Sequence, residues 1–94
     1  MNIFVLEFHP MLGEKTIGII KLIYNDLEFN LRLRMYKKEK LYVELPRIKS
    51  GPAWIYPIRC PTQEIMDEFQ NKVISQVRQR WPYVLNEYYL ANNI

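Results

Sequence analysis

The sequence predicts an α+β fold: a curled antiparallel sheet of about five strands, followed by one amphipathic C-terminal helix and a short helical tail. Two observations predict it. Between residues 2 and 59, short apolar segments are separated by turn signals, and residues 27–36 alternate between apolar and polar side chains with a period of two, as in a half-buried strand. From Thr62 onward, apolar residues recur every three or four positions, as on one face of a helix. A chain of 94 residues suits a single domain spanning residues 1–94.

The first four predicted strands cover residues 2–9, 16–24, 27–36 and 41–45. Strict alternation in the first places Ile3 and Val5 on one face and Phe8 on the other. The second is apolar on both faces, which indicates a central position or a covering partner. The third alternates most clearly, with its apolar positions facing inward and Arg32 and Arg34 facing outward.

The second half of the chain predicts a loop, a fifth strand and the helix. Residues 46–52 are predicted to form a loop, and residues 53–59 a short strand. Thr62 suits the N-cap of the helix because its hydroxyl can accept a hydrogen bond from a free backbone N–H. The apolar stripe of the helix is Ile65, Phe69, Val73, Val77 and Trp81. Pro82 is predicted to end the helix, and the aromatic residues beyond it suit a helical turn packed on a second subunit.

The composition favours a binding protein over an enzyme. The single cysteine, Cys60, can form neither an internal disulfide nor a zinc site. His9 is the only histidine, Ser50 and Ser75 have no evident base partner, and no glycine-rich phosphate loop is present. We therefore expect no catalytic residues, no metal and no cofactor. The first residues lack a basic signal region and no apolar run approaches about 20 residues, which predicts a cytoplasmic protein without membrane contact.

Positive charge is concentrated in the middle of the chain. The net charge is +3, but residues 27–60 carry eight basic and three acidic residues, a net charge of +5. Cations neutralise phosphates, and flat aromatic side chains stack on unpaired bases. The pattern predicts binding to DNA or RNA, and single strands in particular because no helix has a basic recognition face. The candidate binding residues are Arg32, Arg34, Tyr36, Lys37, Lys38, Tyr42, Arg47, Lys49, Trp54 and Arg59.

Two other interpretations fit the same residues. The basic strip is also typical of a solvated sheet face whose charges keep an edge from aggregating. Alternatively, the chain is a small protein-interaction module or inhibitor, of the kind that phages encode, which binds a protein partner through the basic strip or an aromatic patch. The aromatic residues of that patch are Trp54, Tyr56, Trp81, Tyr88 and Tyr89. Salt dependence separates the two, because nucleic-acid affinity falls steeply with salt concentration.

The stretch from Leu41 onward resembles the stage V sporulation protein G (SpoVG, septation regulator) family, as a distant relative. The matching landmarks are Leu41-Tyr42-Val43, Pro46, a basic loop with Lys49, Ile58-Arg59-Cys60-Pro61 and a helix that begins at Thr62. The resemblance implies a homodimer with a swapped or shared sheet. It also implies DNA or RNA binding in a regulatory role, without enzymatic activity.

Overall fold

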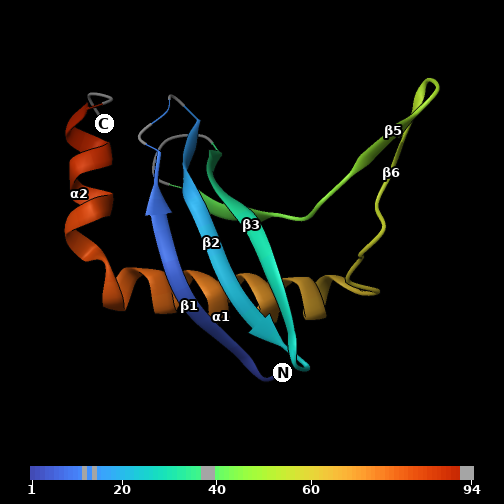
Figure 1. Ribbon diagram of the computed structural model, residues 1–94, viewed down its shortest axis with the longest axis horizontal. Coiled ribbons are helices and arrows are strands. Elements are labelled where there is room, and N and C mark those ends of the chain that lie inside the picture. Colours follow the sequence, from blue (N-terminus) through green and yellow to red (C-terminus); the bar gives the residue numbers. More distant parts are fainter. Residues whose placement is uncertain (12, 14, 37–39, 92–94) are drawn as a thin grey trace.

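The computed structural model describes residues 1–11, 13, 15–36 and 40–91. The elements in chain order are β1 (Ile3–Pro10), β2 (Thr16–Tyr24), β3 (Leu27–Tyr36), β4 (Lys40–Glu44), β5 (Ile48–Ser50), β6 (Ala53–Ile55), α1 (Gln63–Arg80) and α2 (Pro82–Ala91). Strands β1 to β4 form one antiparallel sheet in that order, and β5 pairs with β6 in a separate two-stranded sheet (Figure 1). The predicted α+β class is confirmed, with the strands divided between an open sheet and a hairpin.

The main sheet is a meander whose tightest connection joins β2 to β3. Asn25 and Asp26 form this turn with φ angles of 51° and 62°. Two consecutive left-handed residues are the requirement of a type I′ turn, and Asn and Asp tolerate that conformation better than other residues with a Cβ atom. Strand β2 lies between β1 and β3, so its predicted central position is confirmed.

Strand β1 changes its pattern halfway along. The pairing with β2 shifts between Val5 and Glu7, so that Leu6 is the extra residue of a β-bulge. Beyond the bulge Phe8 lies in the core with Val5. The prediction that Phe8 lies on the opposite face is therefore wrong, because alternation assumes an uninterrupted pleat. A Cβ atom at position 18 would lie 2.5 Å from the His9 carbonyl oxygen and 2.6 Å from the Phe8 ring. Only glycine therefore fits at this position of β2.

Helix α1 lies across one face of the sheet and closes the core (Figure 1). Phe69, Val73 and Val77 are buried, as the predicted stripe requires. Thr62 is the N-cap, and its hydroxyl accepts a hydrogen bond of 3.2 Å from the backbone N–H of Ile65, as predicted. Within the described residues, no helix has the length and apolar character needed to cross a membrane.

Two glutamines of α1 cover the two edges of the main sheet. At the β4 edge, Gln70 accepts a hydrogen bond from the Val43 N–H at 2.6 Å and donates one to the Val43 carbonyl at 2.8 Å. At the β1 edge, Gln76 accepts from the Val5 N–H at 2.8 Å and donates to the Ile3 carbonyl at 2.9 Å. A side-chain amide offers the same donor and acceptor as a peptide group, so each glutamine takes the place of one residue of a neighbouring strand.

The C-terminal segment forms a full second helix. Pro82 ends α1, as predicted, and is also the first residue of α2, where its missing N–H costs nothing. The prediction that this tail packs on a second subunit is wrong for the residues that face inward. Val84, Leu85 and Tyr88 are buried in the core of their own chain.

The predicted loop at residues 46–52 contains strand β5, which is a correction. Strands β5 and β6 form an antiparallel hairpin with the register Ile48↔Ile55, Lys49↔Trp54 and Ser50↔Ala53. Gly51 has a φ of +61°, the left-handed conformation that a tight turn requires and glycine adopts freely. The predicted fifth strand is confirmed only in the shorter form Ala53–Ile55. This hairpin extends away from the sheet on the side opposite α2 (Figure 1). The hairpin and the preceding Arg47 are here called the arm.

Candidate nucleic-acid interface

The arm presents cations and an aromatic ring on one of its faces. Lys49 is the cross-strand partner of Trp54, and paired residues share a face of a sheet. The Arg47 guanidinium lies 4.2 Å from the centre of the Trp54 ring, and the Lys49 ammonium lies 5.9 Å from it. Both distances are within the range of cation–π attraction. Trp54 keeps 50% of its surface exposed, so the cluster is open to a ligand.

The opposite face of the arm is aliphatic. Ile48 and Ile55 are cross-strand partners, with exposed fractions of 58% and 51%. Every residue of β5 and β6 is exposed, whereas each strand of the main sheet contributes buried residues to the core. Exposed apolar side chains that stand together, rather than singly, are typical of binding surfaces.

The outer face of the main sheet carries cations that are largely offset by carboxylates. Arg34 donates a hydrogen bond of 2.6 Å to Glu44, and both side chains are mostly covered. This hydrogen bond raises the pKa of Arg34 above its usual value. Glu44 is also the cross-strand partner of Arg32. The sheet face is therefore mixed in charge, whereas residues 46–61, which include the arm, carry three cations and no carboxylate.

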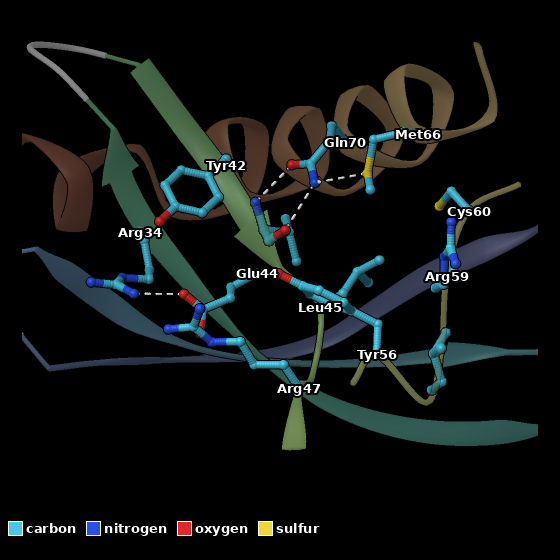
Figure 2. A pocket seen from close by; sticks show the side chains of 12 residues that line it. Arg34, Tyr42, Glu44, Leu45, Arg47, Tyr56, Arg59, Cys60, Met66 and Gln70 are labelled. Atoms are coloured by element: carbon cyan, nitrogen blue, oxygen red, sulfur yellow. Dashed lines mark hydrogen bonds and ion pairs between the residues drawn. The ribbon is translucent and has the colours of Figure 1, made fainter. Parts of the chain in front are cut away.

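Two clefts lie where the arm joins the sheet. The first, here called the root cleft, has a volume of about 480 Å³ (Figure 2). The charged and aromatic side chains that line it are Arg34, Tyr42, Glu44, Arg47, Tyr56 and Arg59. The second, here called the sheet-side cleft, has a volume of about 400 Å³. Its polar and aromatic lining residues are Asn30, Arg32, Arg34, Glu44, Arg47 and Trp54.

The structure brings most of the predicted binding residues to the arm and these clefts. Seven of them line a cleft or stack within the arm: Arg32, Arg34, Tyr42, Arg47, Lys49, Trp54 and Arg59. Tyr36 lies next to Tyr42, with the two rings edge-on and their centres 6.0 Å apart. The remaining two, Lys37 and Lys38, lie outside the described residues. Residues that are distant in the sequence therefore meet at one place on the molecule.

Sequence reasoning missed several residues that line the root cleft, among them Tyr56 and Gln70. Tyr56 was assigned only to a protein-binding aromatic patch, yet it lines the cleft beside Arg47. Gln70 lines the cleft from helix α1. Nothing in the sequence around Gln70 indicates that its side chain hydrogen-bonds to the edge of β4. The available signal for Tyr56 was its place two residues after Trp54, which puts both rings on one face of the strand predicted over residues 53–59. In the structure β6 ends at Ile55, and the two rings line different clefts.

A small charged cluster lies on the outer sheet face away from the arm. Glu7 lies 2.8 Å from His9 and 3.8 Å from Lys21. The hydrogen bond with His9 and the charge of Lys21 hold the pKa of the Glu7 carboxyl below its ordinary value. His9 is exposed at the surface, as its place at the end of a strand predicts. In the described part of the chain, no group of three or more His, Cys, Asp or Glu residues is placed to hold a metal ion.

Comparison with protein-family models, curated proteins and solved structures gives no significant match. The molecule consists of a four-stranded sheet with two helices, and an arm with cationic and aromatic side chains projects from it. The resemblance to the SpoVG family stays a prediction.

Proposed function

We propose that this protein is a non-enzymatic regulator that binds single-stranded DNA or RNA in the cytoplasm, with the arm and its root as the binding surface. The observation that carries the proposal is the exposed cluster of Arg47, Lys49 and Trp54. Cations attract the phosphates of any strand, and an exposed ring stacks on bases that are not held in a duplex. No carboxylate within residues 46–61 opposes this attraction.

The shape of the arm also supports a single strand as the ligand. A two-stranded ribbon can enter the major groove of a duplex, but duplex readers present rows of polar side chains to base edges. Here the exposed face offers a ring and two cations, which match a base face and phosphates. The family resemblance is a second support, because its landmarks Pro46 and Lys49 lie in or beside the arm.

We propose further that the protein acts as a homodimer. The support is the aliphatic face of the arm, where Ile48 and Ile55 are exposed although the chain buries similar residues elsewhere. A chain of 94 residues has a small core, and oligomerisation is a common source of stability at this size. Sedimentation equilibrium tests this proposal: a dimer has twice the chain mass of 11.4 kDa, and Ile48→Asp is expected to give monomers.

The binding test compares two double variants that remove the same charge. Arg47→Ala with Lys49→Ala removes two cations from the arm, and Lys72→Ala with Arg78→Ala removes two exposed cations from α1. Affinity for a labelled single-stranded oligonucleotide is measured by fluorescence anisotropy across a salt series. We expect the arm variant to lower the slope of log affinity against log salt by about 1.4, at roughly 0.7 per lost phosphate contact.

The helix variant is the matched control, and its slope is expected to stay close to that of the wild type. Equal losses in the two variants would show that only net charge attracts the strand, and would contradict a binding role for the arm. The rival function, a protein-interaction module, is favoured by the same aliphatic face. It predicts no measurable oligonucleotide affinity, and a protein contact that changes little with salt.

A further inference from the structure

The root cleft combines positive charge with an accessible ring at the junction of the arm and the sheet. Three arginines and one glutamate line it, and Arg34 already donates a hydrogen bond to that glutamate, Glu44. The ion pairs within the described residues include neither Arg47 nor Arg59. Two guanidinium groups are therefore available to an anion from the walls of one cavity (Figure 2).

The two tyrosines of the root cleft differ in accessibility. Tyr42 is half-buried and is held edge-on against Tyr36. Tyr56 is 46% exposed, on the segment that leads from the arm back to the core. A flat ligand therefore meets the ring of Tyr56 first. Trp54, by contrast, already carries the Arg47 guanidinium against its ring, outside this cleft.

We infer that the root cleft receives one unpaired nucleotide of the bound strand, with its base stacked on Tyr56 and with Arg47 and Arg59, on opposite sides of the cleft, each attracting the backbone phosphate nearest to it (Figure 2). This inference rests on the proposed function. The volume of about 480 Å³ lies within the range of cavities that hold small organic ligands. A base within a duplex is stacked and paired on all sides, so it enters such a cleft only after it is flipped out. The cleft thus selects strands with unpaired bases.

Arg47 connects this nucleotide to the rest of the strand. It lines both the root cleft and the sheet-side cleft, and Trp54 lines the second of these. A strand that passes Arg47 therefore has an aromatic ring on either side of it, Tyr56 in one cleft and Trp54 in the other. The inferred path crosses the root of the arm rather than the open face of the sheet.

The test is a double cycle in which the ligand and the protein each lose one partner of the stack. The ligands are an oligothymidylate of about ten units and an oligomer of the same backbone without bases. The proteins are the wild type, Tyr56→Ala, Tyr56→Phe and Tyr83→Ala, the last an exposed tyrosine of α2 that serves as control. Dissociation constants are measured by fluorescence anisotropy at one fixed salt concentration.

We expect the wild type to lose roughly tenfold or more in affinity when the bases are removed, as the loss of a stacked base requires. Tyr56→Ala is expected to weaken binding of the intact oligomer roughly tenfold and to leave binding of the base-free oligomer unchanged, so the two losses do not multiply. Tyr56→Phe keeps a stacking ring and is expected to bind like the wild type. Tyr83→Ala is expected to change nothing.

Independent losses would overturn the inference while leaving the proposed function intact, because the cations and Trp54 of the arm still bind the strand. Equal affinity of the wild type for both oligomers would overturn the inference and also the proposed stacking on Trp54. Absence of binding to either oligomer would overturn both. A polyglutamate peptide of equal charge that competes as well as the oligothymidylate would assign the cleft to an acidic protein partner, and would also overturn the inference.

Discussion

The body and the arm differ in the burial of their apolar side chains and in the covering of their strand edges. The body, formed by the four-stranded sheet and the two helices, buries its apolar residues in one cluster. Glutamines from α1 occupy part of both of its sheet edges. The arm contributes no residue to that cluster and exposes every residue of its two strands. The body thus supplies the folding free energy, and the arm is free to be shaped by a ligand or a second copy.

Charge follows the same division. On the body, Glu7 lies beside Lys21 and Glu44 beside Arg34, so cations meet carboxylates at short distances. On the arm, Arg47 and Lys49 lie close to the ring of Trp54, and the ion pairs within the described residues include neither of them. Paired charges add little attraction for a distant polyanion, whereas unpaired ones attract it over about the Debye length. A binding role therefore suits the arm better than the sheet face.

The largest expected effect tests whether the core belongs to the body alone. Phe69→Ala removes a ring from the centre of the α1 stripe and leaves a cavity, and we expect a loss of about 3–5 kcal/mol in the free energy of unfolding. Ile48→Ala, an aliphatic truncation on the arm, is expected to change it by less than about 0.5 kcal/mol when the protein is dilute enough to be monomeric. Urea denaturation followed by circular dichroism measures both. A large loss for Ile48→Ala in the monomer would show that the arm packs on the body, whereas a loss that grows with protein concentration is the effect of the proposed dimer.

The next effect concerns the covered edges. Gln70→Ala leaves the N–H and the carbonyl of Val43 without their side-chain partner, and we expect a loss of about 1–3 kcal/mol. The newly open edge of β4 is also expected to promote strand pairing between molecules, visible as light scattering on heating. Gln79→Ala, an exposed glutamine of the same helix, is the control. Equal stability of the two variants would mean that water replaces the amide of Gln70 at no cost.

Most of the body could be predicted from the sequence, because its signals are local. The alternation of β3 and the stripe of α1 repeat over many residues, and the cap at Thr62 is a single-residue signal. The face of Phe8 could not be predicted, since the bulge at Leu6 depends on pairing with β2. The burial of Tyr88 depends equally on where α2 packs, which no periodicity in ten residues specifies.

The binding site could be predicted only as a set of residue types. Arg47, Lys49 and Trp54 were chosen for charge and aromaticity, and the hairpin register that stacks them was not visible in three-residue strands. Gly51-Pro52 is a turn signal, but the prolines at 46 and 52 also fit a loop. The pairing of Arg34 with Glu44 requires the register of β3 with β4, which the alternation within one strand does not specify.

The smallest expected effect sharpens the contrast in charge. The pKa of Glu7 is held below its ordinary value of 4.5 in the folded protein by His9 and Lys21, so the ionised carboxylate stabilises the fold above that pH. This contribution is lost as the pH falls below 4.5, when the carboxyl becomes protonated. We therefore expect the free energy of unfolding of Glu7→Gln to decline less than that of the wild type between pH 7 and low pH.

Lys49→Gln, on the arm, is the control, and its free energy of unfolding is expected to follow a curve parallel to the wild type, since no carboxylate lies within residues 46–61. Urea denaturation at several pH values measures all three, and a parallel curve for Glu7→Gln would show that its contacts are not made in solution.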